Sequence, residues 1–383
     1  ILSLTENNQF RSSQPRQARN VVHHIIKSEM NKKIKLIYLI LILTLNFSCV
    51  EKKSTKKGTN KPELVVTSKT DTLKFTSGIR VILQDHKGNY WIGSHNEGVS
   101  YYNGESFEYF TTNEGLSDNQ IRSIQEDENG KIWFGTAKGI SGYDKGKFTN
   151  YPPKNNNPIF DWNETNGDLW FYSWEEDGIN RFDGINMNYL IFPKPKNKNA
   201  DNTYGVTGIS KDKAGKVWIA TYAALFNYDG KMVNIFDNEK LNLKDNELLH
   251  IRSVLADSKG RIWIGNNGIG VLLMEGNSII NFSEKNNLIH PTSTRRGDNK
   301  SLPGTLEHPF AIEEDSDGNI WFGDVYTGAW KYDGKTLTNY LISDKLSKPM
   351  IWTIYKDSKN NLLFGMADGN IFKFNGKAFE KQF

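Results

Sequence analysis

The sequence predicts an all-β fold, a seven-bladed β-propeller with four antiparallel strands in each blade. Three observations predict it. An anchor residue, Trp in six copies and Leu in the seventh, recurs at gaps of 42, 37, 48, 45, 58 and 42 residues. Two turn motifs accompany it, and aromatic residues make up 12% of the 383 residues. Units of four short strands at a period of about 45 residues are propeller blades, and closing them into a ring removes exposed sheet edges.

The chain begins with two segments that we expect to lie outside this fold. Residues 1–29 are polar and show no periodicity. From Met30 the chain is rich in lysine, then runs apolar from Leu36 to Leu45, and small Ser48 directly precedes Cys49. About ten apolar residues are too few to span a bilayer but suit the core of a signal peptide. Because a signal peptide stands at the N-terminus, we expect 1–29 to be a disordered upstream extension.

Residues 30–49 resemble a bacterial lipoprotein signal, which implies that Cys49 is lipidated. An ordinary secretory signal or a short buried segment is the alternative. Cys49 is the single cysteine, which excludes an intrachain disulfide and a thiolate metal cluster. Residues 50–71 are rich in Lys, Ser and Thr and predict a flexible tether. We therefore expect a propeller over 72–383, lipid-anchored in the cell envelope on the periplasmic or outer-membrane side.

Charge argues against a nucleic-acid partner. The net charge is +4, but lysines cluster in the signal and the tether, so the remainder is close to neutral. A nucleic-acid-binding domain would instead show a basic stripe or patch.

Seven copies of one repeat fill the expected propeller. In each copy an acid stands six residues before the anchor, and a glycine, or Asn360 in the last copy, stands three before it. The second and sixth copies have Asp127, Gly130 and Trp133, and Asp315, Gly318 and Trp321. We expect the Asp to cap a tight turn, the Gly to take a positive φ, and the Trp to fill the wedge between sheets. The anchors are Trp91, Trp133, Trp170, Trp218, Trp263, Trp321 and Leu363.

Each copy parses into four strands. In the second copy these are Ile121–Glu126, Ile132–Thr136, Ile140–Tyr143 and Lys147–Tyr151, with the looser turn "YDKG" between the last two. Asp71–Thr76 resembles a fourth strand, and we expect it to fasten the last blade to the first.

The segments "IRSIQEDENGKIWFGTAKGISGYDKGKFTNY" and "IRSVLADSKGRIWIGNNGIGVLL" resemble the two-component regulator propeller repeat. This repeat is found in the periplasmic sensor halves of bacterial hybrid histidine kinases and in stand-alone secreted proteins. The resemblance covers about residues 79–383. It departs at Tyr172, which replaces a glycine, and at Leu363, which replaces the Trp. It implies a sensory role outside the cytoplasm.

One position near the entry of each innermost strand is a candidate ligand site. Five residues before the turn acids stand Arg80, Arg122, Ile159, Thr207, Arg252, Phe310 and Trp352. Three arginines and two aromatic residues around one rim could hold an anionic or sugar-like ligand through charge-assisted hydrogen bonds and ring stacking. The alternative is that the arginines pair with neighbouring acids and close the channel.

Further candidates lie in the loops that vary between copies, where propeller ligands usually bind. They are His95, Trp174, Tyr222, Tyr326 and His308. His308 ends the longest insertion, 283–308, whose alternative role is a solvated surface excursion. Trp330, on a third strand, is expected to pack in the fold.

The sequence contains no catalytic or metal-binding motif. Its seven histidines show no ligand spacing, and its glycines punctuate turns and never lead into a helix. We expect no cofactor and no metal. Two hypotheses remain. One is a non-catalytic sensory propeller that binds a saccharide, a small anionic ligand or a partner protein, and the other is a propeller-type lyase or hydrolase acting on a polysaccharide or other polymer.

Overall fold

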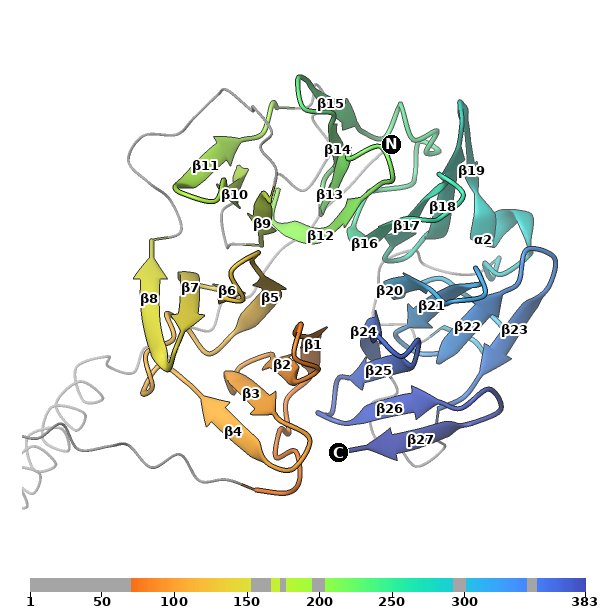
Figure 1. Cartoon of the computed structure of the whole chain (residues 1–383). Coiled ribbons are helices and arrows are strands. Elements are labelled where there is room, and N and C mark those ends of the chain that lie inside the picture. The colour runs from red at the N-terminus through yellow and green to blue at the C-terminus, as the bar shows by residue number, and fades with distance from the viewer. Residues whose placement is uncertain (1–69, 153–166, 173–176, 195–203, 292–300, 343–349) are drawn as a thin grey trace, which may run out of the picture. The chain divides into compact units, whose positions relative to one another are not determined.

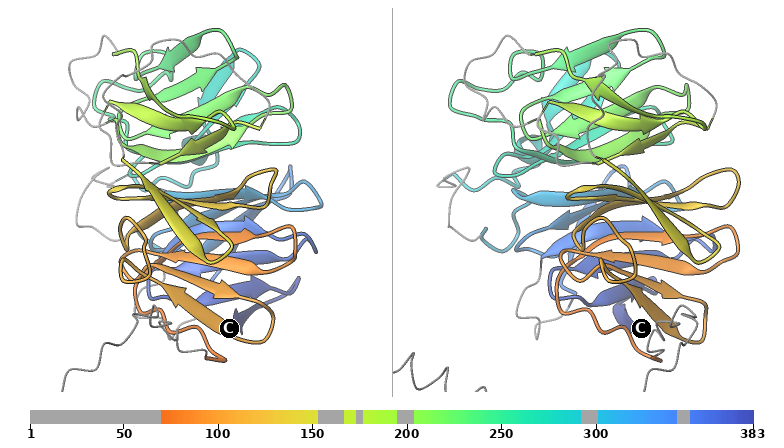
Figure 2. Two further views of the ribbon diagram at one scale, coloured as in Figure 1. Left: turned by 60° about the vertical axis from the view of Figure 1, so that its left-hand side comes forward. Right: turned by 90° about the vertical axis from the view of Figure 1, so that its left-hand side faces the viewer.

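The computed structural model describes residues 70–152, 167–172, 177–194, 204–291, 301–342 and 350–383. They belong to one compact unit, residues 65–383. Seven antiparallel sheets follow one another around a ring, seen face-on in Figure 1 and from the side in Figure 2. Six sheets have four described strands in chain order, and the third has three. The predicted seven-bladed propeller is confirmed. No helix in the described ranges is long and apolar enough to cross a membrane.

Each blade takes its described strands from one stretch of the chain, and in the six blades with four described strands the innermost strand comes first. The strands, blade by blade, are β1 (Ile79–Gln84), β2 (Tyr90–Ser94), β3 (Val99–Tyr102) and β4 (Phe107–Phe110); β5 (Ile121–Glu126), β6 (Ile132–Thr136), β7 (Gly139–Asp144) and β8 (Lys147–Tyr151); β9 (Leu169–Phe171), β10 (Gly178–Phe182) and β11 (Met187–Ile191); β12 (Val206–Lys211), β13 (Val217–Thr221), β14 (Leu225–Tyr228) and β15 (Val233–Phe236); β16 (Ile251–Ala256), β17 (Ile262–Asn266), β18 (Gly270–Glu275) and β19 (Ser278–Asn281); β20 (Pro309–Glu314), β21 (Ile320–Asp324), β22 (Ala329–Tyr332) and β23 (Leu337–Tyr340); and β24 (Ile351–Lys356), β25 (Leu362–Met366), β26 (Ile371–Phe374) and β27 (Phe379–Gln382). A one-turn helix, α2 (Phe282–Lys285), follows β19.

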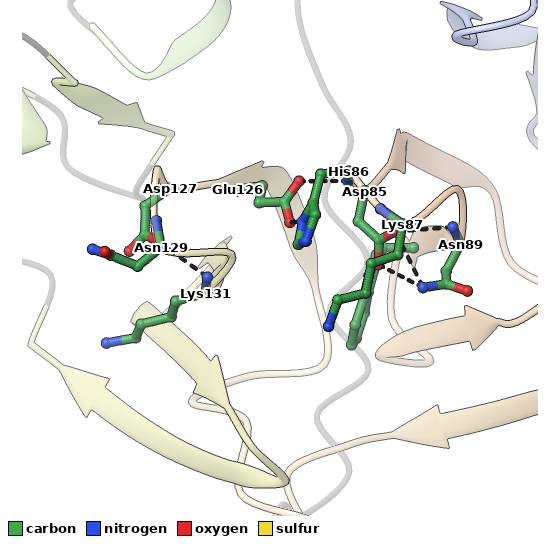
Figure 3. A network of polar contacts seen from close by, with 9 residues as sticks. Asp85, His86, Lys87, Asn89, Glu126, Asp127, Asn129 and Lys131 are labelled. Carbon is green, nitrogen blue, oxygen red and sulfur yellow. Dashed lines mark hydrogen bonds and ion pairs between the residues drawn. The ribbon is translucent and has the colours of Figure 1, made fainter.

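The repeated Asp both caps its turn and holds the Trp. In blade two, Asp127 Oδ1 accepts hydrogen bonds from the backbone N–H groups of Asn129 (2.9 Å) and Lys131 (3.0 Å). Its Oδ2 accepts from the Trp133 indole N–H at 2.8 Å. Gly130 takes the left-handed conformation with φ 78° that the turn requires. Figure 3 shows this turn beside the equivalent turn of blade one. One carboxylate therefore ties the turn to the wedge between blades.

The Trp anchors pack against the next blade. Trp133 lies 4.5 Å, centroid to centroid, from Phe182 of blade three, and Trp321 lies 5.6 Å from Phe364 of blade seven. Both indoles are almost fully buried. Large aromatic side chains at these positions fill the space between neighbouring sheets.

The glycine two residues after the Trp lets the second strand of one blade approach the innermost strand of the next blade closely. A methyl group on Gly323 would lie 2.5 Å from the Ile351 side chain of blade seven. In blade three Tyr172 takes this position, and its hydroxyl accepts a hydrogen bond from Ile209 N of blade four at 2.8 Å. The substitution thus exchanges close contact for a hydrogen bond across the same interface.

The expectation that residues 71–76 supply a fastening strand is wrong. Blade seven takes its four strands from residues 351–382, because the C-terminal sequence already provides its outer strand, β27. Thr70 instead forms an isolated antiparallel bridge with Phe107 of blade one. Phe75 is buried with residues of the first and last blades, so this segment packs across the seam without joining either sheet.

Side-chain contacts close the ring at the seam. Asp357 occupies the turn position of blade seven, where Leu363 offers no indole N–H. Its Oδ2 accepts from the Tyr90 hydroxyl of blade one at 2.8 Å. Burial, followed by this hydrogen bond, raises the pKa of Tyr90 above its usual range. The C-terminal Phe383 ring lies 5.0 Å from the Tyr102 ring of blade one. Figure 1 shows blade seven next to blade one.

Candidate functional site

A β-bulge recurs at one place in the innermost strand of six blades. In blade one Ile79 pairs with Ser94 and Val81 pairs with Gly93, so Arg80 between them has no cross-strand partner. A bulge turns the side chain of its extra residue away from the regular alternation. All six bulge residues line a central cavity of about 400 Å³. They are Arg80, Arg122, Thr207, Arg252, Phe310 and Trp352.

The cavity lining is strongly cationic. Among the described residues that line it, Arg80, Arg122 and Arg252 are the charged ones, and no Asp or Glu accompanies them. Burial, followed by the positive charges of Arg252 and Arg122, lowers the pKa of Arg80 to about 10. The guanidinium groups are therefore close enough to repel one another in a partly desolvated site.

Arg80 is held by an imidazole and an indole. Its Cζ lies 4.5 Å from the centroid of the Trp352 ring. Its Nε and Nη2 lie 3.2 and 2.8 Å from His95 Nδ1. Because a guanidinium can only donate, His95 Nδ1 must accept, which makes the imidazole neutral with its proton on Nε2. Burial, then Arg80 and Arg122, lowers the pKa of His95, in agreement with this assignment.

Arg252 is held in a similar way on the other side of the ring. Its Cζ lies 4.1 Å from the Phe310 centroid and 5.4 Å from the Tyr222 centroid. Its Nη1 donates to the Tyr222 hydroxyl at 3.1 Å. The Tyr222 ring meets His250 edge-on at 4.9 Å. Burial is the main cause that lowers the pKa of Arg252.

The alternative role for the rim arginines was pairing with acids that would close the channel. Within the described residues, the hydrogen-bond partners of Arg80 and Arg252 are the neutral groups His95 and Tyr222. Arg122 donates to Gln120 Oε1 at 2.5 Å, and the negative charge of Asp118 also acts on it, opposing the lowering of its pKa by burial. The cavity remains open between them.

His308 and Tyr326 form a separate cluster that does not line the cavity. His308 is 6% exposed, and its Nδ1 lies 2.6 Å from Asn267 Oδ1. Its backbone N–H donates to the fully buried carboxylate of Asp324 at 2.8 Å, and its ring meets that of Tyr326 at 5.4 Å. These contacts link blades five and six.

The other candidates are placed as follows. Trp330 is 5% exposed and donates to Thr327 Oγ1 at 3.0 Å, so it packs in the fold. Trp174, Ile159 and Cys49 lie outside the described residues.

The sequence analysis missed the residues that support the rim. Gln120, His250 and Met350 stand two residues before a bulge residue, and each contacts the rim: Met350 Sδ, for example, accepts from the Trp352 indole N–H at 2.7 Å. The signal was available, because the repeat register that identified the rim also aligns these residues with one another.

Comparisons with known proteins agree with the repeat assignment. The family model described as "Two component regulator propeller" matches residues 115–138 and 248–268, which confirms the resemblance. None of the curated proteins matches the sequence.

Solved structures with the same architecture include the extracellular domain of the putative hybrid two component system BT3049 from B. thetaiotaomicron. It is 21% identical with a TM-score of 0.56, and the match covers 79% of this chain and 39% of that domain. Virginiamycin B lyase from Staphylococcus aureus is 17% identical with a TM-score of 0.59, covering 80% and 97%. YCF48 from Cyanidioschyzon merolae is 13% identical with a TM-score of 0.53, covering 79% and 97%. The chain thus spans about two fifths of the length of the sensor domain, and at these identities the similarity is one of fold.

Proposed function

We propose that this chain is a non-catalytic sensory propeller, exposed outside the cytoplasm, that binds a small anionic ligand in its central cavity. The observation that carries the proposal is the set of three arginines at equivalent bulges, which line the cavity without an acid among the described lining residues. The regulator propeller repeat, shared with extracellular sensor domains of two-component systems, supports a sensory role.

The physical basis is the electrostatic cost of gathering three guanidinium groups at one cavity. Like charges in a partly desolvated site repel one another, and the lowered pKa values of all three arginines reflect mainly their burial. An anion would relieve this repulsion and form charge-assisted hydrogen bonds, which are about twice as strong as neutral ones. The central cavity is also a common ligand site in closed ring folds.

A thermal-shift screen of the full chain against neutral saccharides, acidic saccharides and small organic acids tests this function. We expect anions to raise the unfolding temperature and to be recovered chemically unchanged. Arg80→Gln should abolish the response. Lys87→Gln, which removes the same charge from an exposed turn of the same blade, should retain it. A hit that is converted to product would contradict the non-catalytic role, and a response that survives Arg80→Gln would place the ligand elsewhere.

We further propose that a lipid on Cys49 anchors the chain to the cell envelope, on the strength of the lipoprotein-like segment 30–49. A lipid on Cys49 and the nearby cluster of lysines in the tether would provide two membrane-binding signals. Replacing Cys49 by Ser should release the protein from the membrane fraction of cells. Retention of the variant in that fraction would refute the anchor.

A further inference from the structure

We propose that the ligand of the central cavity is a compact oxyanion with two or more negative charges, such as phosphate or a di- or tricarboxylate. This inference rests on the proposed function and adds the chemical class of the ligand. It excludes a neutral saccharide and a monocarboxylate as preferred ligands. Three properties of the cavity lead to it: its charge, the way its aromatic rings are used, and its volume.

The charge of the cavity requires more than one negative charge. Arg80 and Arg252 both have neutral hydrogen-bond partners among the described residues, His95 and Tyr222. Each guanidinium stays protonated at physiological pH, since even the lowered pKa of Arg80 is about 10. A monoanion would compensate one of these two charges and leave the other half-buried without a counter-charge, which is unfavourable.

The aromatic rings of the rim already have partners. Arg80 covers the Trp352 ring at 4.5 Å, and Arg252 lies over Phe310 at 4.1 Å. The Trp352 ring also lies against Gly78, where a methyl group would be 2.3 Å from the indole. A neutral sugar is held chiefly by stacking on an open aromatic face and by neutral hydrogen bonds. These rings instead serve to orient guanidinium planes.

A guanidinium stacked on a ring directs its N–H bonds outward in its own plane. Of its five N–H donors, Arg80 directs two toward His95 Nδ1, and Arg252 directs one to the Tyr222 hydroxyl. The remaining N–H donors of each guanidinium project in pairs with a fixed geometry, like the prongs of a fork. Such forks match the paired oxygens of carboxylate and phosphate groups, which accept two parallel hydrogen bonds.

The volume limits the size of the ligand. The cavity measures about 400 Å³, near the lower end of the roughly 300–1,000 Å³ typical of small-molecule sites. Apart from Trp170, Tyr172 and Tyr222, the described lining residues lie on innermost strands, whose backbones are fixed by the sheets. A compact anion such as phosphate or a tricarboxylate fits within this space.

Titration calorimetry on the full chain tests the class, with citrate, inorganic phosphate, acetate and glucose as probes at pH 8 and one fixed ionic strength. We expect the dissociation constants for citrate and phosphate to be at least about tenfold lower than that for acetate. The reason is that each hydrogen bond to a charged group contributes about 1.5–3 kcal/mol, which changes the affinity tenfold or more. Glucose should produce no heat of binding. Arg252→Gln should weaken citrate binding at least about tenfold. Arg252→Lys, which keeps the charge but loses the fork, should lie between.

Lys259→Gln is the matched control, since it removes a positive charge from an exposed turn at the opposite end of the same blade, and it should bind citrate as the parent chain does. Unfolding temperatures check that the variants fold, with Arg80→Gln as the second variant if Arg252→Gln does not. Acetate binding as tightly as citrate, and depending on Arg252, would overturn the ligand class and leave the proposed function intact. Glucose binding as tightly as citrate, and depending on Arg252, would overturn both the class and the anionic ligand of the proposed function. Citrate binding that is unchanged by Arg252→Gln and by Arg80→Gln would overturn the ligand class and the proposed function. If none of the four probes binds, the ligand class is overturned.

Discussion

Replacing Asp257 by Ala is expected to lower the free energy of unfolding by about 3–5 kcal/mol. The substitution leaves the mostly buried Arg261 guanidinium and the Trp263 indole N–H without their carboxylate acceptor. The Asp257 side chain is fully buried. Its Oδ2 accepts from Arg261 Nε at 2.6 Å and from the Trp263 indole at 2.8 Å. Its Oδ1 accepts from the backbone N–H groups of Lys259 and Arg261, both at 2.9 Å. Urea unfolding at pH 7 measures the effect.

The control for this prediction is Asp317→Ala in the exposed turn of blade six, which should change stability by less than about 0.5 kcal/mol. Burial raises the pKa of Asp257, but the hydrogen bonds from Trp263 and Arg261 outweigh it, so the pKa lies below its usual value. The carboxylate therefore stabilises the fold above the unfolded pKa of about 3.9, and this contribution is lost as pH falls through the folded pKa. Equal effects of the two substitutions at pH 7 would refute the role of Asp257.

Replacing Glu313 by Gln is expected to stabilise the protein at pH 8, by about 1–3 kcal/mol. Glu313 lies on β20, and its Oε1 accepts a hydrogen bond from Glu314 N at 3.0 Å, which an amide oxygen can also accept. Burial raises the pKa of Glu313 to about 7, although the Glu314 N–H and Lys356 act in the opposite direction. The charged form is therefore disfavoured in the folded state.

The pH dependence gives this prediction its sign. Between the unfolded pKa, about 4.3, and the folded pKa, about 7, the folded state binds more protons than the unfolded state. Stability therefore falls as pH rises through this range. Glu313→Gln should differ little from the parent chain at pH 4 and be more stable at pH 8 in urea unfolding. The control is Asp317→Asn, an exposed carboxylate on the same blade. A stability difference for Glu313→Gln that is the same at both pH values would contradict the prediction.

The fold could be predicted because every blade carries the same local sequence motifs. The Asp-x-x-Gly turn, the Trp of the second strand and the following glycine recur at fixed offsets, and strands β5, β6 and β8 begin and end at the predicted residues. Local turn chemistry and apolar alternation are properties of neighbouring residues, so the sequence displays them directly.

Closure of the ring could not be predicted in the same way. The seam depends on Tyr90 and Asp357, which are 267 positions apart, and on the packing of Phe75 between the first and last blades. A strand-like pattern at residues 71–76 resembled a fastening strand, but pairing depends on which sheet edge is free, and β27 already occupies that of blade seven.

The site was predicted in part. The repeat register placed Arg80, Arg122 and Arg252 at equivalent positions, but a bulge is a property of strand pairing and leaves no mark in the sequence of one strand. The neutral partners His95 and Tyr222 come from second-to-third-strand loops, where the copies differ. Only the assembled ring brings these loops to the arginines.

The most direct test of the central claim is a crystal structure of the full chain grown with citrate. We predict electron density for the anion in the central cavity, with its carboxylate oxygens within hydrogen-bonding distance of the guanidinium groups of Arg80 and Arg252. A cavity without the anion, at a citrate concentration that saturates binding in solution, would contradict the claim.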